Sequence, residues 1–213
     1  MGRNFTGSLF GATIVPFKDK HIVCAPNTRT ENSRLFVSGF CFFISNSLKV
    51  VGNVNSNSCS HLQENSRNPL IFRSCLFGMS TSSSNTHFLV STPLYRGRGL
   101  GEISSDLKDF HKSYDEQIMP NQMVGYATAN SNKVTLDGTE FIILGGPGIP
   151  EVVNEKFEVG GPEGIIQIQG ANNSESYILK GKEFASAFGS AVLLIDLNND
   201  GNNIEATCLI LNQ

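Results

Sequence analysis

The stretch with the clearest potential for metal chemistry is DLNNDG, at residues 196–201. Oxygen-bearing side chains stand at alternate positions, on Asp196, Asn198 and Asp200, and the backbone carbonyl of Asn202 would add another ligand. Calcium prefers about six to eight oxygen ligands, and a glycine at the sixth position permits the sharp turn of a ligand loop. The spacing therefore predicts a calcium-binding loop.

The acidic residue expected to complete the calcium ligands is not at its usual position in this loop. In a calcium loop within a β-hairpin a carboxylate is expected at the ninth position, which is Ile204 here, and Glu205 follows directly. A register shift of one residue would bring Glu205 to the ion, so we expect a weakened site. An EF-hand is excluded because its twelfth position is Thr207 instead of a bidentate glutamate. The alternative is a plain hairpin turn, since Asn and Asp before Gly favour positive φ without a metal.

The rest of the chain offers little other chemistry, and we predict that it is not an enzyme. The histidines are scattered, with no Ser or Cys at motif spacing and no H-E-x-x-H sequence. Residues 95–101 (YRGRGLG) are rich in glycine, but their spacing does not fit G-x-G-x-x-G and no βαβ unit surrounds them. A flexible exposed loop is favoured there over a nucleotide site.

Composition limits the partners. A share of 39% hydrophobic residues in 213 is enough for a packed core, so a disordered chain is excluded. Only 16% of the residues are charged and the net charge is -3, which gives no basic field for nucleic acid or for an anionic membrane. The apolar runs are far shorter than the roughly 20 residues of a transmembrane helix, so no membrane contact by this segment is expected.

Cysteines indicate an oxidising compartment. None of them form a C-x-x-C pair, so a zinc ribbon is not supported. Four lie in the first 75 residues at spacings of 17, 18 and 16, which suits neighbouring strands cross-linked across short loops. Sequons at Asn4 and Asn172 predict glycosylation and agree with this compartment. The five cysteines are Cys24, Cys41, Cys59, Cys75 and Cys208.

An internal repeat organises the chain. An apolar residue and a glycine open an alternating strand at four places: Phe10-Gly11, Phe77-Gly78, Val124-Gly125 and Phe188-Gly189. After the first three, a second apolar run stops at a proline, which cannot donate to a strand ladder. The starts are 67, 47 and 64 residues apart, which matches the size of a propeller blade. Each unit is predicted to hold three or four antiparallel strands.

The predicted fold class is therefore all-β. We favour a partial β-propeller of about three and a half blades over a β-sandwich, which is also built from short strands and turns. One exception is expected at residues 102–117, where Ile103, Leu107 and Phe110 stand at helical spacing and predict a short surface helix. The predicted units are residues 5–70, 71–118, 119–182 and 183–213.

These features together resemble the β-propeller of an integrin α subunit, which is built of FG-GAP repeats. The likeness covers nearly the whole chain and is closest to the laminin-binding type. It implies blades two to four and the first hairpin of blade five, where the family's calcium loops begin. It also implies disulfides Cys24–Cys41 and Cys59–Cys75, with Cys208 left without a counterpart. The family's G-A-P closings are matched by Cys24-Ala25-Pro26, Ser91-Thr92-Pro93 and Gly145-Gly146-Pro147.

The resemblance implies an adhesion function at the outer face of the plasma membrane. In this family the propeller pairs with an integrin β subunit and ligand binds where the two meet, so an integrin β subunit and a laminin-like matrix protein are the expected partners. Laminin-binding relatives carry their variable specificity segment between blades three and four, which corresponds here to the connection from Tyr95 to Gln117, so Arg96, Arg98 and Glu102 are expected to contact ligand.

Two other functions remain open. A secreted FG-GAP binding module, or a truncated decoy, would act without a β subunit. A phospholipase-like FG-GAP hydrolase would need a metal-binding cluster of His, Asp and Glu, and the sequence offers none. Since open sheet edges expose unpaired backbone groups, we also expect poor stability unless a partner covers them.

Overall fold

The computed structural model describes residues 7–29, 37–56, 59, 74–95, 98–113, 122–130, 140–148, 152–153, 156–157, 163–171, 176–183, 186–195 and 205–207. The elements assigned in these ranges are all β-strands, so the all-β prediction is confirmed. Over the same ranges, no helix has the length and apolar character needed to cross a bilayer.

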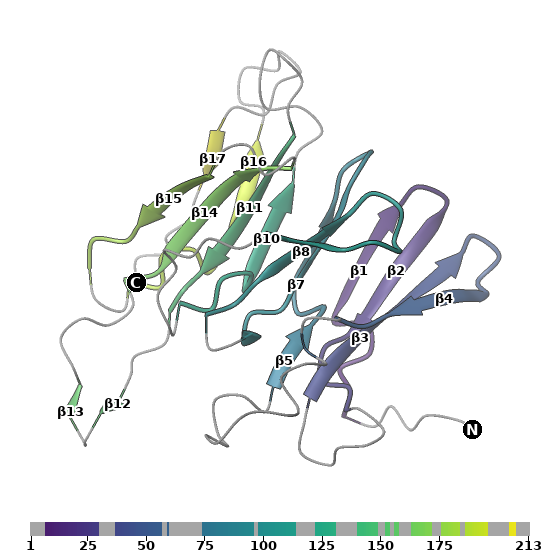
Figure 1. Cartoon of the computed structure of the whole chain (residues 1–213), viewed down its shortest axis with the longest axis horizontal. Coiled ribbons are helices and arrows are strands. Elements are labelled where there is room, and N and C mark those ends of the chain that lie inside the picture. Colours follow the sequence, from purple (N-terminus) through teal and green to yellow (C-terminus); the bar gives the residue numbers. More distant parts are fainter. Residues whose placement is uncertain are drawn as a thin grey trace.

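Three antiparallel sheets lie one after another in chain order, and a hairpin follows the third sheet in the sequence (Figure 1). The first sheet contains β1 (Thr13–Phe17), β2 (Lys20–Ala25), β3 (Val37–Ser45) and β4 (Val50–Val54). The second contains β6 (Thr81–Ser83), β7 (Phe88–Ser91), β8 (Gly101–Ser104) and β9 (His111–Ser113). The third contains β10 (Ala127–Asn130), β11 (Phe141–Gly146), β14 (Ile165–Gly170) and β15 (Ser176–Lys180). The last hairpin is β16 (Leu193–Ile195) with β17 (Glu205–Thr207).

Two shorter elements complete the described chain. A small hairpin, β12 (Val152–Val153) with β13 (Lys156–Phe157), lies between β11 and β14 in sequence. Strand β5 (Ser74–Phe77) pairs in parallel with β3 and so joins the second unit to the first sheet. The sheets and the last hairpin fall within the four predicted units, and the described strands do not close into a ring.

Burial explains the sequence pattern of the strands. The second strand of each unit, β2, β7 or β11, is a nearly continuous apolar run and is buried along most of its length. A strand whose side chains are buried on both faces needs no polar alternation. The outer strands β4 and β15 are mostly exposed and are more polar or alternating.

Two core clusters fill the spaces between the sheets. Between the first and second sheets, Phe17 on β1 packs at a ring-centroid distance of 6.1 Å from Phe88 on β7. Between the second and third sheets, the core is aliphatic and is made of Leu89, Ile103, Val124, Ile142, Leu144 and Ile165. Burial of these side chains stabilises the stacking by about 25 cal/mol for each Å² of apolar surface removed from water.

The helix predicted at residues 102–117 is wrong, because the described part of this segment forms strands β8 and β9 and the turn between them. Side chains in the turn bind the backbone N–H groups that a helix would use: the Leu107 N–H donates to Ser104 Oγ at 2.9 Å, and those of Lys108 and Asp109 donate to Asp106 Oδ1. The Lys108 N–H bond, followed by that of Asp109, holds the pKa of the Asp106 carboxyl below its ordinary value.

The helical spacing of the apolar residues has another origin. Ile103 belongs to the core between the second and third sheets, while Leu107 and Phe110 pack on the core between the first and second. The hairpin therefore presents apolar side chains to both of its neighbours, and the spacing does not reflect one face of a helix.

Candidate functional site

All four predicted FG positions fold into the same tight turn. The residue before the apolar one has φ of 53–56° and the glycine after it has φ of 84–90°. In each turn the N–H of the fourth residue donates to the carbonyl of the first at 3.0 Å. The four turns begin at Leu9, Leu76, Met123 and Ala187 and contain Gly11, Gly78, Gly125 and Gly189.

The apolar residue of each later turn locks its unit onto the preceding sheet. Phe77 pairs in parallel with Gly39, Val124 with Gly99 and Phe188 with Gly164. A Cβ atom on any of these partner glycines would lie 2.0–2.2 Å from a backbone oxygen of the incoming turn. The close approach therefore requires glycine at these three positions, each of which lies within two residues of the start of the third strand of its unit, β3, β8 or β14.

The glycine-rich segment 95–101 is anchored in the described structure. Tyr95 and Leu100 are buried against Cys59 and Cys75, and the Lys112 ammonium lies 5.6 Å from the centre of the Tyr95 ring. The prediction of a flexible exposed loop is therefore wrong for Tyr95, Leu100 and Gly101, because Tyr95 and Leu100 pack on the disulfide and Gly101 begins the buried strand β8.

Among the three expected ligand-contact residues, two are described and they lie in different settings. Arg98 is half-buried, its N–H donates to the Tyr95 carbonyl, and its own carbonyl accepts the Val124 N–H at 2.9 Å. It thus stands at the junction of the second and third units. Arg96 lies outside the described residues.

Glu102 does not have the surface position expected of a ligand contact. It lies on β8 with 3% of its surface exposed and accepts a hydrogen bond from the Ser56 hydroxyl. Ser56 Oγ in turn accepts the Cys59 N–H at 3.2 Å. The carboxylate therefore positions the start of the segment that the second disulfide closes, because a buried carboxylate is stable only with such donors.

The two predicted disulfides are present. Cys24 and Cys41 are directly paired in the β2–β3 register, with their Cα atoms 4.0 Å apart. Cys59 and Cys75 are joined with a Cα separation of 6.1 Å. All four side chains are fully buried.

The predicted calcium loop is framed by the last hairpin. Ile195 on β16 pairs with Glu205 on β17, so residues 196–204 form the connection between the two strands. Glu205 thus stands at the end of the loop, opposite the residue before Asp196. The remaining predicted ligands, Asp196, Asn198, Asp200 and Asn202, lie outside the described residues, as do the sequons Asn4 and Asn172. Within the described ranges no three His, Cys, Asp or Glu side chains are grouped to hold a metal ion.

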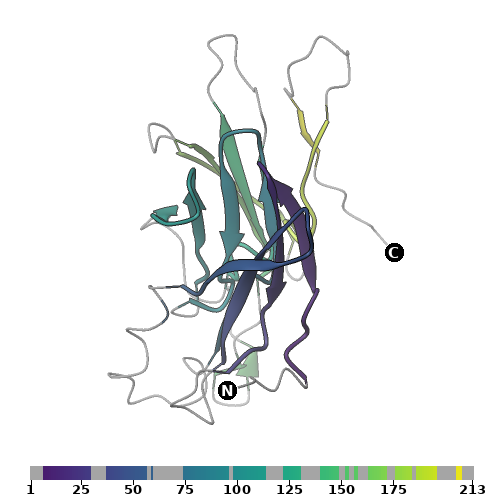
Figure 2. The same cartoon turned by 90° about the vertical axis from the view of Figure 1, so that its right-hand side faces the viewer.

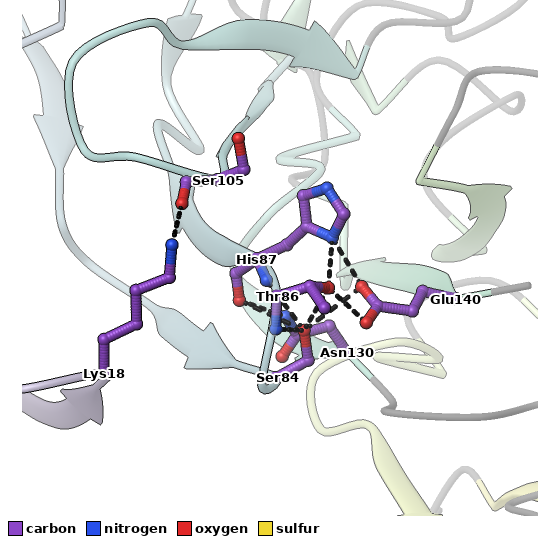
Figure 3. A network of polar contacts seen from close by, with 7 residues as sticks. All are labelled: Lys18, Ser84, Thr86, His87, Ser105, Asn130 and Glu140. Carbon is purple, nitrogen blue, oxygen red and sulfur yellow. Dashed lines mark hydrogen bonds and ion pairs between the residues drawn. The ribbon is translucent and has the colours of Figure 1, made fainter.

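Figure 3 shows a polar cluster that the sequence did not indicate. His87 Nδ1 lies 2.5 Å from Glu140 Oε2, and the Thr86 and Ser84 hydroxyls also donate to the Glu140 carboxylate. The Asn130 side-chain amide donates to the His87 carbonyl at 3.1 Å. The cluster joins the β6–β7 turn of the second sheet to β10 and to the residue before β11 in the third.

The two hydroxyls of the cluster have different partners, and it is Thr86 Oγ1 that contacts the imidazole, at 2.7 Å from His87 Nδ1. The Ser84 hydroxyl donates to Glu140 and accepts the backbone N–H groups of His87 and Thr86, so it is engaged by its own turn instead of by the imidazole. Ser84 is therefore not paired with the imidazole as a nucleophile with its base would be. On the other side of the second sheet, the Lys18 ammonium donates to the Ser105 carbonyl at 2.6 Å and links the first and second sheets (Figure 3).

We expect the His87–Glu140 contact to be energetically coupled. His87→Ala and Glu140→Ala should each lower the free energy of unfolding, and their coupling energy in a double-mutant cycle should be about 0.5–3 kcal/mol. Urea denaturation of the four proteins measures this quantity. Lys18→Ala combined with Glu140→Ala is the matched control and should be additive, because the two side chains share no partner. Additivity of the His87 and Glu140 losses would show that the contact does not stabilise the sheet junction.

No known protein-family model matches this chain.

Proposed function

We propose that this chain is a segment of an integrin α-like cell-adhesion receptor, which binds a laminin-like matrix ligand outside the cell together with an integrin β subunit. The observation that carries the proposal is the recurrence of one FG turn in four successive units, with the same backbone conformation in each. Buried disulfides support an oxidising compartment such as the cell exterior.

The region we propose for ligand contact is the turn around Arg98. Its backbone is fixed by Tyr95 and Val124, and the buried Tyr95 rests on the second disulfide. Arginine offers a planar, charged donor group, and because the backbone here is already fixed, binding would not need to order it further. We propose that Arg96 shares this role. Glu102 is instead buried, and it accepts a hydrogen bond from the Ser56 hydroxyl.

The test measures binding of the whole chain to a purified integrin β ectodomain and to laminin, by surface plasmon resonance in calcium-containing buffer. We expect saturable binding of the β ectodomain, and laminin binding that Arg98→Glu weakens at least tenfold, equivalent to about 1.4 kcal/mol. Lys49→Glu, a charge reversal in the β3–β4 turn, is the control and should have no effect. Laminin binding without any β-subunit binding would favour a secreted module, and binding of neither partner by a folded chain would refute the proposal.

Calcium binding is a separate expectation of the same proposal. Isothermal titration calorimetry of the chain with calcium should give saturable one-site heat that both Asp196→Ala and Asp200→Ala abolish, because each removes a carboxylate ligand. Glu205→Gln should weaken binding if this residue supplies the displaced closing acid. Absence of heat from a folded sample would mean that residues 196–204 form a plain hairpin turn.

A further inference from the structure

The second sheet has different contacts on its two faces. Figure 1 shows this sheet between the first and the third, and Figure 2 views the chain from the side of the first. The core toward the first sheet is rich in aromatic rings, with the Phe88 ring centre 6.1 Å from that of Phe17 and 6.4 Å from that of Phe110. The core toward the third sheet is aliphatic, and polar side chains meet across the same junction.

One group of these polar side chains lies along β6 and β10. Ser80 Oγ is 2.9 Å from Thr128 Oγ1 on β10, and the Ser84 hydroxyl donates to the Glu140 carboxylate at 3.2 Å. Alternate residues of a strand share a face, so Ser82, between Ser80 and Ser84, also faces the third sheet. The first strand of the second sheet therefore presents a line of three hydroxyls to the third sheet.

A second group lies on β9 and β14. The Ser113 hydroxyl of β9 and the Gln167 side-chain amide of β14 both donate to Gln169 Oε1, the latter at 3.0 Å. Gln167 and Gln169 share their face of β14 with Ile165, which belongs to the core between the second and third sheets. These two groups, together with Asn130 on β10, are called the polar seam of this junction.

Three buried atoms of the polar seam have no hydrogen-bond partner among the described residues: Ser82 Oγ, Asn130 Oδ1 and Gln167 Oε1. Asn130 faces the second sheet, because its side-chain amide donates to the carbonyl of the residue before β7 at 3.1 Å. The other two atoms of this kind in the described ranges belong to Ser8 and Gln122, which directly precede FG turns. A buried polar atom without a partner is destabilising, so the junction of the second and third sheets is weakened where it is polar.

The second sheet has stronger connections to the first. Strand β5 pairs with β3, the Cys59–Cys75 disulfide closes the segment that leads into β5, and the Cys24–Cys41 disulfide lies against Gly78 of the second unit. The third sheet meets the second through the isolated bridge at Val124, whose N–H donates to the Arg98 carbonyl at 2.9 Å. The first two sheets therefore have covalent and strand-pairing links that, in the described ranges, the second and third sheets lack.

We propose that the chain opens at the polar seam: the third sheet and the last hairpin separate from the first two sheets while each part stays folded. Water then binds the polar groups of the seam, including the three unpartnered atoms, so opening recovers their solvation. Separation of the first and second sheets would instead expose aromatic rings. The aliphatic side chains that opening exposes keep the open form a minority of the population. The proposal rests on packing alone, so it stands or fails independently of the receptor function.

Native-state hydrogen exchange of the full chain, measured by NMR over a series of urea concentrations, tests the proposal. The Val124 N–H bond crosses the junction, whereas the Gly78 N–H donates to the Ser91 carbonyl within the second unit at 2.9 Å. Val124 should exchange through an opening at least tenfold more populated than the one that exposes Gly78, because separation of the third sheet leaves the second folded. Amides of β11 and β14 should stay protected in that opening. Equal populations with equal urea dependence would show one cooperative unit and overturn the proposal.

A seam variant shows whether the opening at Val124 involves the whole polar seam. Ser82→Ala combined with Gln167→Met removes two unpartnered oxygens, while Gln169 Oε1 keeps the Ser113 hydroxyl. The closed form is then stabilised relative to the open form, so Val124 exchange should slow at least tenfold. Unchanged Val124 exchange would mean that only the turn around Val124 frays, which would refute the proposal.

Ser83→Ala is the matched control. Ser83 follows Ser82 on β6 but faces the first sheet, where its hydroxyl donates to the Pro16 carbonyl at 2.6 Å. This change should leave Val124 exchange unaltered, because the proposed opening keeps the first and second sheets together. Slower Val124 exchange in the control would trace the effect to the loss of any hydroxyl from β6 and would contradict the proposal.

Discussion

Replacing Gly78 with alanine should destabilise the chain by about 1–3 kcal/mol more than replacing Gly11 with alanine. The two glycines have nearly the same backbone, with φ of +87° and +84°, so the strain of placing an L-residue there, about 1–2 kcal/mol, is common to both. Their surroundings differ. A Cβ atom on Gly78 would stand 2.6 Å from Cys24 Cβ and 2.9 Å from Cys41 Sγ, whereas the space at Gly11 is open among the described residues.

The overlap at Gly78 should cost much unfolding free energy because the neighbouring side chains cannot move away. Cys24 and Cys41 are covalently joined and lie on paired central strands, so relief would require the second unit to move away from the first sheet. Urea denaturation of both alanine variants measures the difference, with the Gly11 variant as the matched control for φ strain. Equal losses would show that the FG turn of the second unit can shift without loss of stability.

The parts of the fold that the sequence predicted are those with a local steric cause. A glycine is needed at each FG turn, and a proline follows the second strand in the first three units, so the unit boundaries are visible in the residues. The sequence did not indicate the left-handed conformation of the first residue of each turn. Leu9 and Leu76 adopt positive φ without being glycine, which is uncommon for bulky residues, and in both turns the N–H of the fourth residue donates to the carbonyl of this leucine.

The parts that sequence reasoning missed depend on contacts between distant residues. His87 and Glu140 are 53 positions apart, and their neighbours in sequence give no sign that the two side chains meet. In the sequence, Glu102 lies beside two arginines and therefore suggests a surface charge. The one sign that it is buried is its position between the apolar residues Leu100 and Ile103. The helix at residues 102–117 failed because Ser104 and Asp106 compete for backbone N–H groups, a turn signal that outweighs apolar spacing.

The second large effect is expected from the Cys24–Cys41 disulfide. The double variant Cys24→Ala/Cys41→Ala should lose about 3 kcal/mol of unfolding free energy in the chain-closure model, which predicts this value for a loop of roughly 15 residues. The actual separation is 17 residues, and both sulfurs are fully buried between the first sheet and the turn at Gly78. Urea denaturation under non-reducing conditions measures the loss.

A comparison between the two disulfides separates the contribution of loop closure to stability from the contribution of local packing. Cys59 and Cys75 are 16 residues apart, so Cys59→Ala/Cys75→Ala should lose nearly the same closure free energy. The Cys24–Cys41 bond lies directly against Gly78, whereas Cys75 precedes Leu76, the first residue of the same turn. Removal of Cys24–Cys41 should therefore speed hydrogen exchange of the Gly78 N–H, which donates to the Ser91 carbonyl at 2.9 Å, more than removal of Cys59–Cys75 does. A loss below about 1 kcal/mol would contradict this prediction and would mean that β2 and β3 remain paired in the unfolded chain, where the disulfide then removes little entropy.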